Sequence, residues 1–257
     1  MKWGKLATFA VAVAASGTLF SAGAAWSERT PPPNLGAAVS DAARPQTDKD
    51  RDPERKPLEV MEFIRIKTGQ TVVDLMPGGG YFTRLFSVAV GPMGKVYAFL
   101  PSEMAKFSKT PVPASGSSPD PAHPNVTLLV APIAQFAMPE PVDVIWTSQN
   151  YHDLHDPFMG PADITQFNKA VFNALKPGGE FVVLDHAAPD GSGLAATNTT
   201  HRIDAAVVKK EVTAAGFIYE GESKVLRNPA DPRTALVFDK SIRGHTDQFI
   251  YKFRKPK

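Results

Sequence analysis

The sequence predicts an α/β fold, with a doubly wound, mostly parallel sheet that has an antiparallel edge. From residue 58 to residue 216, short runs rich in β-branched residues alternate with segments whose apolar residues recur at helical spacing. Beyond residue 216, strand-like runs follow one another without a long helix between them. Strands joined by short connections pair antiparallel, so we expect the edge at the C-terminal end of the chain.

The individual elements follow in chain order. Apolar residues at helical spacing predict a helix over 58–64 that ends before Gly69, and residues 71–76 read as a buried strand. A glycine turn and a helix over 81–90 come next, whereas the Pro/Ser/Gly-rich residues 111–124 predict a surface excursion. Further strands are predicted over 95–100, 126–130, 142–147, 181–185, 217–225, 234–238 and 248–253, and further helices over 164–175 and 203–215.

The first 54 residues predict a targeting signal and a tether. Lys2 and Lys5 precede an apolar stretch over 6–20, and the small residues 21–25 follow it, so residues 1–25 are typical of a cleaved signal peptide. The apolar stretch is short for a membrane span. Proline-rich residues 26–54 predict a linker, which leaves a domain over 55–257. We therefore expect an exported protein, periplasmic or secreted, with no stable membrane span after cleavage.

The composition narrows the possible partners. The 257 residues include 28 Lys+Arg, 26 Asp+Glu and no cysteine. Loss of residues 1–25 removes two lysines and no acidic residue, which leaves 26 of each sign. A neutral mature chain does not point to nucleic acid as a partner. The absence of cysteine excludes disulfides, thiolate metal sites and cysteine nucleophiles.

The glycine turn is the first candidate binding feature. Ligands of such sheets bind outside the carboxyl ends of the strands. There, Gly78-Gly79-Gly80 lets the backbone approach a ligand closely, and Asp74 lies just before it to accept hydrogen bonds from the turn or from a cationic ligand. The dinucleotide fingerprint fails, because Thr83 occupies its last glycine position. A tight turn without a ligand stays open as an alternative. The loops at these carboxyl ends are 77–81, 100–103, 148–156 and 185–202.

The segment around this turn resembles a known family. Val72-Val73-Asp74-Leu75-Met76-Pro77-Gly78-Gly79-Gly80-Tyr81 is similar to the first motif of class I S-adenosylmethionine-dependent methyltransferases. Three later features follow in that family's order, so that the resemblance covers residues 55–225. They are Val142-Asp143-Val144-Ile145-Trp146 with Tyr151-His152-Asp153-Leu154, Leu175-Lys176-Pro177-Gly178-Gly179-Glu180-Phe181, and Ala214-Ala215-Gly216-Phe217.

The resemblance implies a Rossmann-like methyltransferase fold, S-adenosylmethionine as cofactor and a small-molecule substrate. The matching positions imply that Asp74, Gly78, Gly79, Gly80 and Tyr81 contact the cofactor. With the export signal, the segments Asp185-His186 and His201-Arg202-Ile203-Asp204 make the chain similar to a subgroup of exported predicted methyltransferases.

Three positions depart from the family pattern. Met76 stands where the family has glycine, and Leu100 stands where it has an acidic residue that binds both ribose hydroxyls. Pro132 takes the place of a third acidic position beside the adenine. Hydrogen bonds to a charged partner contribute about 1.5–3 kcal/mol each, so loss of the ribose pair weakens binding by roughly two orders of magnitude. Glu103 is a candidate replacement at the ribose, although its position alone favours a solvated carboxylate at a helix start.

The loops after the fourth and fifth predicted strands hold the candidate chemistry. Methyl transfer needs the acceptor positioned and, for some acceptors, a base. His152 suits a base near neutral pH. Asp185 and His186 end the fifth strand, and we expect them to face the same cleft as His201 and Arg202 at the next helix start. Each also suits a structural role. His152 suits a loop histidine that packs against the cofactor, Asp185 and His186 suit a hydrogen-bonded pair at a strand end, and His201 suits the start of a helix. No metal site is expected, because His152-x-x-His155 alone is a weak ligand pattern.

Two functions from different classes remain. The first is an S-adenosylmethionine-dependent methyltransferase that acts on an unknown small molecule. The second is an exported, non-catalytic binding or scaffold protein that keeps the methyltransferase fold. The export signal and the missing acidic positions favour the second, whereas the intact glycine turn and the ionisable residues near it favour the enzyme.

Overall fold

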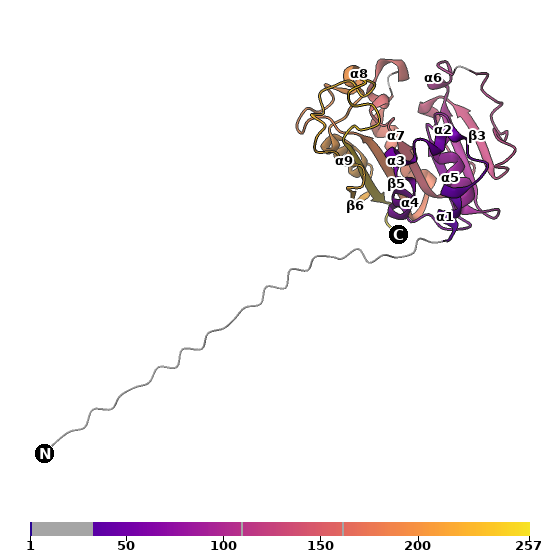
Figure 1. Cartoon of the computed structure of the whole chain (residues 1–257), viewed down its shortest axis with the longest axis horizontal. Coiled ribbons are helices and arrows are strands. Elements are labelled where there is room, and N and C mark those ends of the chain that lie inside the picture. The colour runs from indigo at the N-terminus through magenta and orange to yellow at the C-terminus, as the bar shows by residue number, and fades with distance from the viewer. Residues whose placement is uncertain (2–32, 109, 161) are drawn as a thin grey trace. The chain divides into compact units, whose positions relative to one another are not determined.

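A computed structural model describes residue 1 and residues 33–108, 110–160 and 162–257. Within the described residues, seven strands form one sheet in the order β3-β2-β1-β4-β5-β7-β6. Figure 1 shows β3 and β6 at opposite sides of this sheet. β7 pairs antiparallel with both β5 and β6, whereas the other neighbouring strands pair parallel, so the predicted, mostly parallel sheet with an antiparallel edge is confirmed. The strands are β1 Thr71–Leu75, β2 Lys95–Pro101, β3 Val126–Ala131, β4 Val142–Ser148, β5 Leu175–His186, β6 Ile218–Ser223 and β7 Gln248–Arg254.

Helices cover both faces of this sheet. On one face lie α1 (Pro33–Ser40), α4 (Pro57–Ile64) and α5 (Tyr81–Val90), and on the other lie α7 (Ile164–Ala174) and α9 (Ala205–Ala214). The shorter helices are α2 Gln46–Lys49, α3 Asp52–Arg55, α6 Ser102–Ala105 and α8 Thr197–Thr200, with 3₁₀ turns η1 Ile133–Gln135, η2 His152–His155 and η3 Pro157–Met159. None of the helices in the described part of the chain has the length and apolar character to cross a membrane.

Alternation along the strands explains the two layers of core. In β1, Val72 packs with the α1, α4 and α5 side, whereas Val73 and Leu75 pack with the α7 and α9 side. All five residues of β1 are buried, as expected for a strand with helices over both faces. The sheet is therefore a rigid platform, and its carboxyl ends present the loops that matter for function.

One predicted strand is wrong. Residues 234–238 form an irregular loop, and their backbone groups bond to α8 and to the side chain of Arg202 instead of to a strand. The Ala235 carbonyl accepts a hydrogen bond from Arg202 Nε at 2.8 Å, and the Val237 N–H donates to the Thr200 carbonyl at 3.2 Å. β5 also begins at Leu175 rather than at residue 181, because Leu175 pairs with Val142 before the register shifts.

The predicted linker over 26–54 also needs correction. Residues 33–54 form α1, α2 and most of α3, and they pack on the domain. Leu35 is buried, and Asn34 Nδ2 donates to the Ala89 carbonyl of α5 at 2.7 Å. Prolines begin these helices instead of extending the chain, since Pro33 starts α1 and Pro53 lies in the first turn of α3. Residues 26–32 and the predicted signal peptide after residue 1 lie outside the described residues.

Candidate active site

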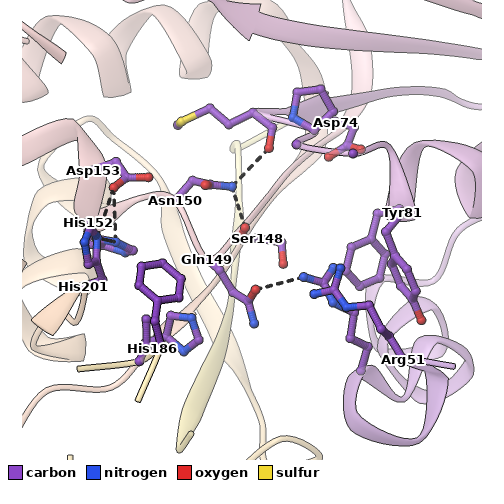
Figure 2. Close-up of a pocket in the computed structure, with 18 of the residues that line it drawn as sticks. Arg51, Asp74, Tyr81, Ser148, Gln149, Asn150, His152, Asp153, His186 and His201 are labelled. Atoms are coloured by element: carbon purple, nitrogen blue, oxygen red, sulfur yellow. Dashed lines mark hydrogen bonds and ion pairs between the residues drawn. The ribbon is translucent and has the colours of Figure 1, made fainter. Parts of the chain in front are cut away.

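A cavity of about 580 Å³ opens at the carboxyl ends of β1, β4 and β5 (Figure 2). The glycine turn after β1 lines it on one side, and the loops that carry His152 and His201 line it on the other. Figure 2 shows Gln149 and Asn150, which follow β4, between these two sides. The volume of this cavity falls within the usual range for small-molecule sites. The cavity lies at the carboxyl ends of the strands, where the sequence predicts a ligand site.

A second cavity of about 320 Å³ lies along the same turn. It is lined by Leu100 at the end of β2 and by the Pro-rich excursion, including Val112 and Asp120. Pro77, Gly78 and Gly79 line both cavities. An elongated ligand that lies across this turn therefore has room on both sides of it.

The turn itself presents bare backbone to open space. Gly78 and Gly80 have φ values of +54° and +79°, a region that only glycine adopts without strain. A Cβ added at Gly78 or Gly79 would meet nothing within 4 Å. Met76 also has a positive φ, +60°, which gives a physical reason for the glycine that the family prefers at this position. Its side chain lines the larger cavity.

Asp74 and Tyr81 flank the turn as the resemblance implies. Asp74 is buried and accepts a hydrogen bond of 2.5 Å from the Thr83 hydroxyl in the first turn of α5. Burial raises the pKa of Asp74 to about 7. The Tyr81 hydroxyl donates to Asp52 Oδ1 at 2.6 Å. Both residues line the larger cavity, so the first motif and the cavity coincide.

Two arginines that the sequence analysis does not single out line one side of the cavity. Arg51 and Arg55 line it, although both fell within or beside the predicted linker. The Arg55 guanidinium lies 4.7 Å from the centre of the Tyr81 ring and donates from Nη2 to Gln149 Oε1 at 2.9 Å. Burial, reinforced by the charge of Arg51, lowers the pKa of Arg55 to about 10, so Arg55 is cationic at neutral pH. A polar helix of four residues such as α3 has no hydrophobic periodicity, so the sequence gives no sign that Arg55 faces a cavity.

His152 is the centre of a buried cluster. Its Nδ1 lies 2.9 Å from Asp185 Oδ1, and its backbone N–H donates to Asp185 Oδ2 at 2.8 Å. Its Nε2 lies 3.2 Å from Asp153 Oδ1 and 3.3 Å from His201 Nδ1. Asp185 lies behind His152 and does not line the cavity, so it positions the imidazole instead of contacting a ligand.

The charge state of His152 differs from the one expected of a base. Burial alone would lower its pKa, but the carboxylates of Asp185 and Asp153 outweigh burial and raise the pKa to about 10. His152 is therefore protonated at neutral pH and has no free lone pair. The role expected of His152, a base at neutral pH, lacks support from this charge state.

His186 has the opposite character. It shares a 2.7 Å hydrogen bond with the Thr246 hydroxyl and lines the cavity. Burial lowers the pKa of His186 to about 3, so the ring is neutral at neutral pH. It is an uncharged polar group placed to contact a bound molecule.

The remaining candidates lie elsewhere. The Glu103 carboxylate accepts a hydrogen bond of 3.2 Å from the Ile133 N–H, and it lines neither cavity. Arg202 is fully buried in an ion pair of 2.8 Å with Asp231. His155 points to Glu211, 3.3 Å away, and not to His152. Asn150, by contrast, was missed, and its Nδ2 donates to the Met76 and Ser148 carbonyls, which ties the ends of β1 and β4 together at the cavity.

Comparison with curated proteins finds methyltransferases. The chain is 28% identical over 197 residues to the ubiquinone/menaquinone biosynthesis C-methyltransferase UbiE of Pseudomonas paraeruginosa, which covers 75% of this chain and 65% of that protein. It is 27% identical over 136 residues to the enzyme of the same description from Pseudomonas aeruginosa, which covers 51% of this chain and 48% of that one. The chain thus spans about half to two thirds of these relatives. No family model matches it.

Comparison with solved structures finds the same fold. A SAM dependent methyltransferase from Aquifex aeolicus superposes with a TM-score of 0.51 at 19% identity, over 82% of this chain and 98% of that one. A putative sarcosine dimethylglycine methyltransferase from Galdieria sulphuraria gives 0.52 at 12% identity, over 82% and 86%. The [4+2]-cyclase SpnF gives 0.53 at 16% identity, over 81% and 80%. The chain therefore has the fold of these S-adenosylmethionine-dependent methyltransferases, and the curated proteins to which its sequence is similar are methyltransferases.

Proposed function

We propose that the protein is an S-adenosylmethionine-dependent methyltransferase that acts on a small molecule. The observation that carries this proposal is the bare glycine turn between two cavities. Gly79 has no positive φ, and a side chain there would project into open space, so neither the backbone conformation nor the packing of the protein on itself requires glycine at this position. A ligand that lies against the backbone explains this choice of residue.

The residues present fit such a cofactor in part. The apolar wall of the smaller cavity, with Leu100 and Val112, suits an adenosine group. In the larger cavity, Asp74 offers a carboxylate to the sulfonium, and Arg55 offers a cation to the carboxylate of the amino-acid end. Leu100 offers no hydrogen bond to the ribose, so we expect weak binding, in the micromolar range or above. The cofactor supplies a methyl group on a positively charged sulfur.

The chain's own residues hold the acceptor in place. The neutral His186 and the side-chain amides of Gln149 and Asn150 line the cavity and offer polar contacts that orient the acceptor. The UbiE relatives methylate carbon in ubiquinone and menaquinone biosynthesis, as their description states. For this chain we propose only that the acceptor is a small molecule, and not a nucleic acid, because the mature chain carries no net charge.

We also propose that the protein is exported and belongs to the subgroup of exported methyltransferases that its sequence resembles. The charged, apolar and small-residue segments over 1–25 support this proposal. Export raises a question of supply, because S-adenosylmethionine is made in the cytoplasm. The missing acid at Leu100 likewise favours the alternative function, an exported binding protein that keeps the fold without turnover.

Calorimetric titration of the full chain with S-adenosylmethionine and with its demethylated product tests the proposal. We expect heats of binding that fit one site, with dissociation constants in the micromolar range or above. Absence of binding at millimolar ligand would remove the methyltransferase function. Binding without transfer of a labelled methyl group to any acceptor in a panel of phenols, thiols, amines and quinols would favour the binding protein.

A further inference from the structure

Three side chains with metal-ligating atoms converge at one end of the larger cavity. We propose that His152, Asp153 and His201 bind a divalent transition-metal ion there. His152 and Asp153 come from η2, and His201 ends α8, so the cluster forms only in the folded chain. Figure 2 shows the three side chains facing one another at the wall of the cavity.

The distances between the ligand atoms match those around a metal centre. His152 Nε2 lies 3.2 Å from Asp153 Oδ1 and 3.3 Å from His201 Nδ1, and the third pair is 3.8 Å apart. Bonds of about 2.0–2.2 Å to a tetrahedral ion place its ligand atoms roughly 3.3–3.6 Å from one another. An ion therefore fits among these atoms with small side-chain adjustments. All three residues line the cavity, so further coordination positions face a ligand.

The surroundings orient the first of these ligands. Asp185 holds the Nδ1 side of His152 at 2.9 Å and anchors the same residue through its backbone N–H. A carboxylate behind a metal-bound histidine fixes the tautomer and the orientation of the ring. This contact directs Nε2 toward Asp153 and His201. His201 itself has a φ of +54°, which is unusual for a residue with a side chain and places its ring beside His152.

The balance of charge also favours a cation. Asp153, Asp185 and Asp156 bury three carboxyl groups near two histidines. Neither carboxyl oxygen of Asp156 has a hydrogen-bond partner within the described part of the chain. Buried carboxylates are stable only when they are compensated by cations or by hydrogen bonds. A divalent ion supplies more of this compensation than one protonated histidine.

The ligand types select the kind of ion. Two imidazoles and one carboxylate suit zinc, iron or a similar first-row ion, and open positions are typical of catalytic sites. Magnesium and calcium prefer sites made of oxygen ligands. We therefore expect zinc to bind here and magnesium not to bind at comparable concentrations.

The ion has a role in methyl transfer, and this part of the inference rests on the proposed function. A hydroxyl or thiol acceptor bound at an open position has a lowered pKa and releases its proton to solvent. The resulting oxygen or sulfur anion attacks the methyl carbon. The new bond to carbon forms as the bond from carbon to the sulfonium breaks, and the departing sulfur keeps the electron pair as a neutral thioether. The substrate class is then phenols, enols or thiols.

Metal binding is tested on the metal-stripped full chain without S-adenosylmethionine. Titration with zinc should show one site, and magnesium should show none. Cobalt should give a visible absorption spectrum typical of nitrogen and oxygen ligands. His201→Gln and Asp153→Asn should each weaken zinc binding at least tenfold, whereas His155→Gln should leave it unchanged because His155 points to Glu211. Asp185→Asn should weaken it by roughly 10–100-fold, as loss of an outer partner does.

His201→Gln decides the matter even if the more buried variants fail to fold, because its side chain is 30% exposed. A folded His201→Gln variant that binds zinc like the wild type would overturn the inference, as would a wild type that binds none. A protein that binds zinc but not S-adenosylmethionine would contradict the proposed function and leave the metal site standing. A protein that binds S-adenosylmethionine but not zinc would overturn the metal site and leave the proposed function standing.

Discussion

A substitution at Gly79 can test ligand binding without disturbing the fold of the turn. Gly79 lines both cavities, has no positive φ and would meet no protein atom with an added Cβ. We predict that Gly79→Val leaves the midpoint of urea unfolding nearly unchanged and weakens S-adenosylmethionine binding at least tenfold by calorimetry. Gly36→Val is the matched control, because Gly36 in α1 also has open space but lies away from both cavities. Unchanged affinity in Gly79→Val would place the cofactor elsewhere.

His152 makes the stability of the metal-free protein depend on pH. Its pKa is raised from 6.5 to about 10 in the folded chain, because Asp185 and Asp153 outweigh its burial. Its contribution is therefore complete below about pH 6.5 and is lost as the pH rises toward 10. We predict that the free energy of unfolding of wild type falls across this window more steeply than that of His152→Gln, measured in urea with a chelator.

The control for this pH dependence is His186→Gln. The pKa of His186 lies at about 3 because of burial, so His186 is neutral in both states above about pH 7.5 and should not alter the slope there. Parallel pH curves for wild type and His152→Gln would show that the ring of His152 is neutral in the folded protein.

The sequence allowed some site residues to be predicted and hid others for a physical reason. Asp74 and the glycines were accessible because a strand, a turn and a helix are contiguous in the chain, and local spacing fixes their geometry. His201 meets His152 across 49 positions of sequence, and Arg55 reaches the cavity from a segment without hydrophobic periodicity. Contacts of this kind depend on how loops pack, which no local pattern encodes.

At the scale of elements, the end of β2 offers a test by gain of affinity. Leu100 lines the smaller cavity where the family places an acid. We predict that Leu100→Asp tightens S-adenosylmethionine binding by about tenfold to hundredfold, because a carboxylate can accept hydrogen bonds from both ribose hydroxyls. Calorimetry measures the change, and an analogue without these hydroxyls should gain nothing. Equal gains for both ligands would mean that charge alone, and not the ribose contact, is responsible.

The N-terminal helices should contribute to stability, which a tether would not. Arg44 is 2% exposed, donates to the Val39 carbonyl at 2.6 Å and forms two hydrogen bonds with Asp52. We predict that Arg44→Ala lowers the free energy of unfolding by about 2–3 kcal/mol, since it removes a buried pair whose acid is partly exposed. Urea unfolding measures the loss. The exposed Arg51 gives a control. If Arg44→Ala lowers the free energy of unfolding no more than Arg51→Ala does, the N-terminal helices do not stabilise the domain, as expected of a linker.

Patterns with strong periodicity predicted elements well, and those without it did not. The β-branched run of β1 and the helical spacing of α7 appear as expected. The run over 234–238 has strand-like composition, yet Arg202 and Thr200 take its backbone hydrogen bonds. A β-prone composition permits a strand, but a strand forms only where a neighbouring strand accepts its backbone hydrogen bonds.

At the scale of the whole molecule, alternation of strands and helices was sufficient to predict the fold class and the edge that carries the site. The proposed export lies beyond the described residues and needs its own measurement. We predict that the protein recovered from an exporting host begins near residue 26, as read by mass spectrometry of its N-terminal peptide. Recovery of the intact N-terminus in the soluble cell interior would contradict export.

The position of β7 between β5 and β6 has a consequence for how the protein is made. Of the strands in the described residues, β7 comes last in chain order, and β6 pairs with β7. A nascent chain can therefore assemble at most the five strands from β3 to β5 until β7 has emerged from the ribosome. The sheet closes late in synthesis, so β5 keeps an unpaired margin while the rest of the domain is already made.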